Sequence, residues 1–585
     1  MDLLLIGIVA LLAVVAVAIV TTLAQRLGVA GPLLLVALGL CVGLLPFVEV
    51  PEIDPEWILV GVLPPLLYAA AVRLPAIEFR RDFTPIAGLA VILVVGTALA
   101  LGGFFALLLP DTGFALGVAL GAILSPTDAV ATGIAKRLGI APRVITLLEG
   151  ESLLNDATAL VLLRTALLAV AAGSFSFGSA VGSFAWAVFI AVAVGALVGW
   201  LTMRLRSWVR SSPASTAIGF TVPFLAYLPT EHLEGSGLVA AVVAGIVAGQ
   251  GAQRWFTPEQ RLSDEVNWRT VELVLEGGIF LVMGLELDQI VEDVLSRNEG
   301  IALPTALALG ALAIVLVVRA GFVAVLLWAG RWRGRRIDRT RIEQFDAKLD
   351  EIAEQGWPEQ GALGARGRGR RAPSPQQAER RLSTMRTRVT RLLADLDYYQ
   401  SSPLGWKHGT VIVWAGMRGV VTLAAAQTIP RTVESRAELV YIAFIVALVS
   451  LMLQGFTLPW LVRALRLSAP GEVSDTTERV RLDDELRAAA ASAVTGGALV
   501  RRDGTPFDAD LLSRTGMRYA QPPDDDSSAS AQEMLELHLA VLEEMRARLI
   551  ALSSDGTFGT GTLRHAMARL DADQISVELR LRDEG

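Results

Sequence analysis

The strongest constraint on the fold is a series of apolar stretches, each about 20 residues long, that recur between residue 1 and about residue 463. A stretch of this length crosses the hydrocarbon core of a bilayer, which is about 30 Å thick. Only 19% of the 585 residues are charged, whereas soluble proteins carry about 25%. The pattern excludes a soluble multidomain protein and predicts an all-α polytopic membrane protein.

Thirteen of these apolar segments are expected to cross the membrane, within a transmembrane domain that covers residues 1–465. Their approximate ranges are 2–24, 29–48, 57–72, 84–109, 112–135, 144–172, 181–203, 214–230, 236–250, 269–289, 303–330, 408–430 and 437–463. The first segment lacks a positive leader and a small-residue cleavage site, so we interpret it as a retained span.

The charges of the connecting loops predict the topology. Loops after odd-numbered segments are basic, as at Arg80 and Arg81, and loops after even-numbered segments are acidic, as at Glu52. Arg431 and Arg436 are the main exceptions. Basic loops remain in the cytoplasm. We therefore expect a multi-pass protein of the plasma membrane, with the N-terminus outside and the C-terminus in the cytoplasm.

A long cytoplasmic loop, residues 331–403, is expected to be inserted in this domain. It holds 16 Lys/Arg and 10 Asp/Glu residues. Its apolar positions recur with helical spacing opposite a basic face, which predicts an amphipathic helix; they are Leu382, Met385, Val389, Leu392 and Leu396. Such a helix lies on anionic lipid or pairs with another helix. A solvated helical hairpin is the alternative.

The polar tail, residues 466–585, shows helical runs near 476–498, 531–552 and 561–582. It contains no phosphate-binding loop, metal-ligand cluster or catalytic triad. We interpret it as a cytoplasmic regulatory or interaction domain that binds a regulator.

Ionisable side chains are costly inside a bilayer, so those that occur there are functional candidates. Asp156 lies about twelve residues from the cytoplasmic end of the sixth segment, roughly 18 Å along a helix and close to the bilayer centre. Ser152 shares its helix face and Glu151 its flank. A carboxylate beside a hydroxyl is a hard-oxygen site for a small cation. A structural buried ion pair is the alternative.

The run Ser125-Pro126-Thr127-Asp128 interrupts the fifth segment. Proline removes a backbone donor and breaks a helix, and the freed backbone groups need protein or a watery cavity. Asp128 can compensate the positive dipole of a broken helix end. Thr127 can offer its hydroxyl and carbonyl to an ion. A kinked helix without an ion site is the alternative.

A second interruption, at 416–419, lies in the twelfth segment, seven segments after the first. If segments 1–6 and 8–13 are repeats, this offset inverts one relative to the other. Paired interrupted helices in inverted repeats mark the midplane site of secondary transporters. Arg418 in this interruption and Arg319 in the eleventh segment can balance the buried carboxylates.

Four motifs occur together along the chain: Ser125-Pro126-Thr127-Asp128, Gly150-Glu151-Ser152-Leu153-Leu154-Asn155-Asp156, Gly416-Met417-Arg418-Gly419 and Gln454-Gly455-Phe456-Thr457. The combination resembles the sodium/proton exchanger family, and most closely its bacterial electroneutral branch. The resemblance covers roughly residues 1–465 apart from the 331–403 loop. It implies a fold of inverted six-helix repeats, with a mobile core part and a dimerisation part, and therefore a homodimer.

The resemblance also implies roles for single residues. Asp156 would bind the cation or the proton, Glu151 and Ser152 would support the site, and Thr127 would contribute from the crossed helices. Asp128 would neutralise the helix ends there.

Two arginines and a neutral residue complete what the resemblance implies. Arg319 would pair with Glu151, and Arg418 would lie near the broken twelfth segment. Asn155 stands where the electrogenic branch has a second aspartate, so the resemblance implies exchange of one cation for one proton. Glu276 departs from the family pattern, which has a neutral polar residue in this segment. It would shape the cytoplasmic ion entrance or take part in the charge count.

The expected function is exchange of a monovalent cation, first of all Na⁺, for H⁺ by alternating access. It requires no cofactor besides the transported ions, which are H⁺ and Na⁺ or K⁺ and in addition Li⁺. Such a protein is not an enzyme, and its surroundings are lipid rather than nucleic acid. A K⁺/H⁺ antiporter of the same fold is the alternative, and a channel or scaffold is the alternative from another class. An intramembrane aspartyl protease is disfavoured because its Gly-x-Gly-Asp motif is absent.

Overall fold

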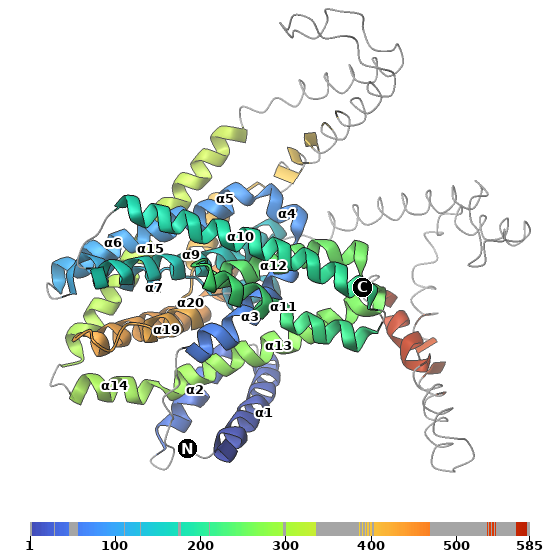
Figure 1. The fold of residues 1–585 in the computed structure, drawn as a ribbon, viewed down its shortest axis with the longest axis horizontal. Helices are drawn as coiled ribbons and strands as arrows, with labels where there is room; N and C mark the ends of the chain where they lie inside the picture. Colours follow the sequence, from blue (N-terminus) through green and yellow to red (C-terminus); the bar gives the residue numbers. More distant parts are fainter. Residues whose placement is uncertain are drawn as a thin grey trace, which may run out of the picture. The chain divides into compact units, whose positions relative to one another are not determined.

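The structure is a computed structural model in which the chain divides into two compact units, Met1–Ala469 and Pro470–Gly585. The described residues are 3–27, 30–45, 56–109, 112–128, 130–172, 177–209, 211–296, 300–334, 385, 389, 392–393, 395–396, 398–399, 403–467, 535, 538–539, 541–542, 545, 569–578 and 580–581. They form helices, turns and short connections, and no strand occurs among them (Figure 1). The expected all-α class is confirmed.

The first unit is built from helices, and two short π-helical segments, named η1 and η2, directly precede α3 and α6. In chain order they are α1 (Leu3–Leu27), α2 (Gly31–Gly43), η1 (Trp57–Val62), α3 (Leu63–Val72), α4 (Ala76–Arg81), α5 (Phe83–Ala87), η2 (Gly88–Ile92), α6 (Leu93–Leu108), α7 (Gly113–Leu124), α8 (Val130–Arg137), α9 (Pro142–Ala172), α10 (Phe177–Trp208), α11 (Ser212–His232), α12 (Gly237–Trp255), α13 (Pro258–Leu285), α14 (Leu287–Ser296), α15 (Ala302–Gly334), α18 (Trp406–Trp414), α19 (Val420–Gln427) and α20 (Arg436–Leu465).

Six helical stretches in the described part of the chain are long and apolar enough to cross a bilayer. They are Gly7–Ala24, Phe83–Leu108, Pro142–Val170, Val181–Trp208, Ala302–Trp332 and Arg436–Leu465. Four shorter apolar helices accompany them, at Gly31–Gly43, Trp57–Val72, Gly113–Leu124 and Gly237–Ala252. The chain is therefore a multi-pass membrane protein, and the count of thirteen spans stays a prediction.

The helices of the first unit pack as two groups. One group, which we call the scaffold bundle, consists of α1, α2, α3, α10, α11, α12 and α13. The other group, which we call the core bundle, consists of α6, α7, α8, α9, α15, α18, α19 and α20. Each group is held together by many helix–helix contacts, whereas fewer contacts join one group to the other. Such an arrangement allows one bundle to move against the other.

Helix α13 is held firmly in the scaffold bundle because it approaches α2 very closely. A methyl group on Gly39 of α2 would overlap the Leu281 carbonyl oxygen, and one on Gly284 of α13 would overlap the Val36 carbonyl oxygen. Small residues at such positions let membrane helices pack backbone to backbone. The side chains of α13 that face away from α2 therefore keep a fixed position relative to the scaffold bundle.

Within the first unit, part of the 331–403 loop packs next to a buried ion pair. The Arg143 guanidinium lies 3.0 Å from the Asp82 carboxylate, which is fully buried. The Tyr398 hydroxyl donates to the same carboxylate at 3.0 Å, and Arg81 Nε lies 2.6 Å from Asp395. Burial, together with the charge of Asp82, raises the pKa of Tyr398 above its usual value. The hydroxyl therefore keeps its proton and remains a donor.

This contact leads to a first prediction. Tyr398→Phe is expected to lower the free energy of unfolding by about 1.5–3 kcal/mol, the range for a hydrogen bond to a charged group. Tyr399→Phe is the matched control, because its half-exposed hydroxyl donates only to the Arg81 carbonyl, at 2.6 Å. Thermal unfolding of the purified protein measures both, and equal effects of the two variants would contradict the assignment.

The remaining loop and tail predictions are only partly within the described residues. In the loop, Val389 and Leu396 are buried and Leu392 is exposed; Leu382 and the opposing arginines lie outside the described residues. In the second unit, Leu542, Leu570 and Val577 are buried in one apolar cluster. The roles of the 331–403 loop and of the 466–585 tail stay predictions.

Candidate functional site

Two interrupted helices cross in the core bundle, and the crossing is made by their non-helical segments. Residues 125–128 separate α7 from α8, and residues 415–419 separate α18 from α19. The Asp128 amide donates to the Met417 carbonyl at 2.7 Å. This bond satisfies one backbone group of each interruption within the protein, as a bilayer requires. Both interruptions expected from the sequence are present.

Asp128 lies at the N-terminal ends of two half-helices. Its Oδ1 accepts from the Val130 amide at 3.3 Å, at the start of α8. A methyl group on Gly419, the residue that precedes α19, would overlap the same carboxylate. Helix N-termini carry partial positive charge, so a carboxylate between two of them is stabilised. This is the position that the sequence predicts for Asp128.

Arg418 lies at the two opposite ends, where carbonyl groups carry partial negative charge. Its Nε donates to the Leu124 carbonyl at the end of α7, at 3.0 Å, and its Nη1 donates to the Gly416 carbonyl after α18. The Arg418 amide donates to Ser450 Oγ of α20 at 3.0 Å. We expected Arg418 to balance a carboxylate, whereas the described residues show it bound to backbone carbonyls.

Glu151 of α9 and Arg319 of α15 form a buried ion pair, as the resemblance implies. Arg319 Nη1 and Nη2 both contact the Glu151 carboxylate, Nη2 at 2.9 Å from Oε2. Arg319 also donates to the Ile412 carbonyl of α18, at 3.0 Å from Nε and 2.8 Å from Nη2. The exposed fractions of the two side chains are only 1–2%. The negative charge of Glu151 is therefore compensated within the protein.

Thr127 is fixed to α9 by three polar contacts. Ser152 Oγ donates to the Thr127 carbonyl at 2.8 Å, and Asn155 Nδ2 donates to the Thr127 hydroxyl at 2.7 Å. That hydroxyl lies 3.5 Å from Glu151 Oε1 and donates toward it. The polar residues of the crossing and those of α9 are thus joined in one network.

Asp156 differs from Glu151 and Asp128, the two carboxylates described above. Its side chain is 7% exposed, and it makes no hydrogen bond or ion pair with any other described residue. It lines a cavity of about 850 Å³ together with Thr127, Asp128 and Ser152. An accessible carboxylate next to hydroxyl and carbonyl oxygens is able to take a proton or a small cation.

The cavity connects Asp156 to one surface of the molecule. Its rim includes Lys136, Glu265 and Arg269, whose side chains are 55%, 53% and 66% exposed. A second cavity of about 590 Å³, which Arg164 and Glu231 line, shares no described lining residue with the first. In this structure Asp156 is reached from the side that carries the basic loops.

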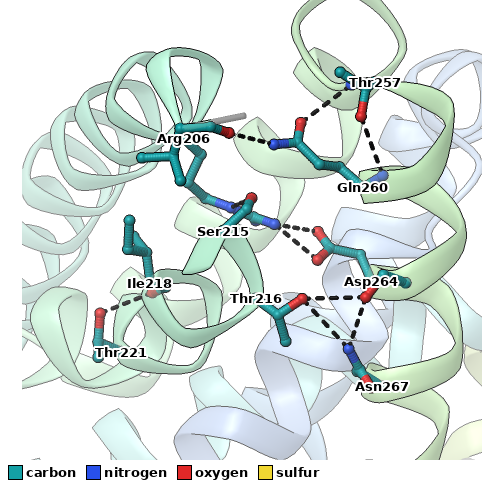
Figure 2. A network of polar contacts seen from close by, with 11 residues as sticks. Arg206, Ser215, Thr216, Ile218, Thr221, Thr257, Gln260, Asp264 and Asn267 are labelled. Carbon is teal, nitrogen blue, oxygen red and sulfur yellow. Dashed lines mark hydrogen bonds and ion pairs between the residues drawn. The ribbon is translucent and has the colours of Figure 1, made fainter. Parts of the chain in front are cut away.

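A polar network at this rim was not predicted from the sequence. Arg206 at the end of α10 holds Asp264 of α13 at 2.7 and 2.8 Å and donates to Ser215 of α11 at 2.9 Å (Figure 2). Close by, Thr257 and Gln260 form the N-terminal capping box of α13 (Figure 2). The network ties three scaffold helices together beside the cavity mouth. The basic residues that follow the seventh predicted span include Arg206, but a single sequence does not show that Arg206 pairs with Asp264.

Gly419 provides a second prediction. Gly419→Ala is expected to abolish most of the cation/proton exchange that the sequence predicts, because its methyl group would displace the Asp128 carboxylate from the helix ends. Gly133→Ala in α8 is the matched control, since its methyl group would meet no atom within 4 Å. Cation-driven proton flux in proteoliposomes compares the two variants. Full activity of the Gly419 variant would contradict the proposed packing.

Comparison with known proteins places this geometry in context. A family model described as "Sodium/hydrogen exchanger, transmembrane" matches residues 12–345 and 384–464. A relative from Escherichia coli, named an uncharacterised Na⁺/H⁺ exchanger, is 29% identical over 92% of this chain and 92% of its own length. A Bacillus pumilus relative, named a sodium, potassium, lithium and rubidium/H⁺ antiporter, is 27% identical over 54% of this chain and 49% of its own length.

The fold is similar to a solved structure of a sodium proton antiporter from Methanocaldococcus jannaschii. The similarity has a TM-score of 0.56 at 18% identity, and it covers 80% of this chain and 100% of the other. At this level of identity the likeness concerns the fold alone.

Proposed function

Since the chain belongs to the sodium/hydrogen exchanger family, and is therefore a cation/proton antiporter rather than an enzyme, we propose that it exchanges Na⁺ for H⁺ without net charge transfer. The observation that carries this proposal is the state of three carboxylates at the crossing. Glu151 is paired with Arg319, and Asp128 lies at helix ends. Asp156 faces the cavity without a partner among the described residues.

Competition at Asp156 supplies the coupling. A buried carboxylate is unfavourable while it is charged and unpaired. Either a proton or a bound cation relieves this cost, and each prevents the other from binding. Ser152 and Thr127 would complete a cation site beside Asp156, with Glu151 and Asn155 holding Thr127 in place. Thus one ion leaves before the other enters.

The neutral Asn155 supports electroneutral exchange. Its amide donates to Thr127, and it adds no second negative charge to the site. A site with one exchangeable carboxylate carries one cation or one proton in each direction. The charge that crosses the membrane with the site is then the same in both steps.

Alternating access would be provided by movement of the core bundle against the scaffold bundle. The cavity that opens on one side only supports this mechanism. By the positive-inside rule this side is the cytoplasm, with the N-terminus outside, the C-terminus inside and the chain in the plasma membrane. The homodimer and a regulator bound to the tail belong to the same proposal.

K⁺/H⁺ exchange is the second candidate. It is favoured by the similarity to the Bacillus pumilus antiporter, whose name includes potassium. The residue types around Asp156 do not decide between the two ions, because selectivity depends on the size and flexibility of the site.

The function is tested with the purified full chain in proteoliposomes that contain a pH-sensitive dye. We expect saturable proton flux on addition of Na⁺, compared with K⁺ and Li⁺ in parallel. We expect its rate to be independent of an imposed membrane potential. A larger response to K⁺ would favour the second candidate. A non-saturable flux that follows the potential would indicate a channel and contradict the proposal.

A further inference from the structure

Glu276 of α13 is an acidic residue within the segment that the sequence predicts to be the tenth span, residues 269–289, and the exchange mechanism above gives it no role. Its side chain lines the same cavity as Asp156. Among the described residues, no hydrogen bond or ion pair joins it to another side chain. A carboxylate at this depth is costly and is retained for a function in most membrane proteins.

The charged groups around Glu276 do not neutralise it. Glu272, one turn earlier on α13, is the residue that pairs with Arg73 at the end of α3. Arg73 also lies within electrostatic range of Glu276, but its ion pair is with Glu272. Asp128 lies within electrostatic range of Glu276 and also of Asp156. Glu276 and Asp156 therefore approach the crossing from opposite bundles, with the cavity between them.

Glu276 and Asp156 belong to different helix bundles. Gly277, next to Glu276, packs against Val17 of α1, and Gly284 packs against α2. Glu276 is thus fixed in the scaffold bundle, whereas Asp156 belongs to α9 in the core bundle. When the core bundle moves against the scaffold bundle, Asp156 moves with the core bundle and Glu276 does not.

We propose that Glu276 is a second cation-binding carboxylate, which receives the monovalent cation from the cytoplasmic cavity and passes it to Asp156. This inference rests on the proposed function of Asp156. Since Glu276 remains on the scaffold, it raises the affinity for the cation on one side of the membrane only. It adds no charge to the group that crosses, so the exchange stays electroneutral.

The proposal predicts that loss of the Glu276 charge weakens cation binding at the cytoplasmic face of the membrane only. Glu276→Gln is expected to raise the KM for Na⁺ about tenfold at the cytoplasmic face, at the low end of the enrichment that a charge-lined cleft produces. The KM at the outer face is expected to stay unchanged. Glu276→Asp, which keeps the charge, is expected to lie between the wild type and Glu276→Gln.

The test compares everted and right-side-out membrane vesicles that contain the full chain, with Na⁺ titrated from each face. Glu265→Gln is the matched control, because this glutamate lies on the same helix at the cavity rim and pairs with Arg269. The normal KM at the outer face shows that the Glu276→Gln protein is folded. An unchanged KM at both faces, or an equal change at both, would overturn the inference while exchange itself remains. Loss of exchange in the wild type would instead overturn the proposed function.

Discussion

Asp156→Asn is expected to abolish cation/proton exchange and to leave the protein folded in the membrane. Asparagine has the size of aspartate but neither releases a proton nor supplies a negative charge to a cation. Because Asp156 makes no hydrogen bond or ion pair with another described residue, the substitution breaks no polar contact with these residues. The loss should therefore be confined to function.

The measurement is Na⁺-driven proton flux in proteoliposomes, together with the size-exclusion profile of the purified variant. Glu149→Gln is the matched control, because Glu149 lies on the same helix and lines the same cavity but pairs with Lys136. We expect flux at background for Asp156→Asn and near wild type for Glu149→Gln. Sustained flux in the Asp156 variant would show that another group carries the proton.

Much of this site could be predicted because its signals are local in the sequence. Pro126 removes a backbone donor within an apolar segment, and Asp156 interrupts another with a charge. Both are unusual enough in a membrane helix to be read from a single chain. The positions of Asp128 at two helix ends and of Arg319 beside Glu151 agree with those expectations.

What the sequence does not contain is the pairing of residues that lie far apart along the chain. The contact between Asp128 and Met417, and that between Arg206 and Asp264, depend on how helices pack. Arg418 shows the consequence. A buried arginine among acidic residues is expected to pair with a carboxylate, yet its hydrogen bonds go to the carbonyl groups that the two interruptions leave free.

Glu276 illustrates the same limit. Its place in an apolar segment marks it as unusual, but a sequence does not show whether it faces lipid, another helix or the cavity. The packing of α13 on α1 and α2 through glycines decides this, because it fixes the helix so that the flanking face with Glu276 lines the same cavity as Asp156. The function of a charged residue in a membrane protein thus depends on the helix bundle to which the residue belongs.

The largest effect on stability is expected for Arg319→Met. The substitution leaves Glu151 charged, 1% exposed and without its partner. Removing one member of a buried ion pair costs about 3–5 kcal/mol, because the remaining charge is not compensated. The variant also loses the two hydrogen bonds to the Ile412 carbonyl that join α15 to α18. We expect a strongly lowered unfolding temperature and no exchange.

The double variant Glu151→Gln/Arg319→Met separates the charge from the packing. If the uncompensated charge dominates, neutralising Glu151 recovers most of the lost stability, although the hydrogen bonds to Ile412 remain absent. Arg164→Met is the control at an exposed pair, since Arg164 and Glu231 are 53% and 35% exposed and such pairs contribute about 0–1 kcal/mol. Thermal unfolding in detergent measures all three variants. A double variant no more stable than Arg319→Met would show that the arginine acts through its contacts with α18, and not through the charge of Glu151.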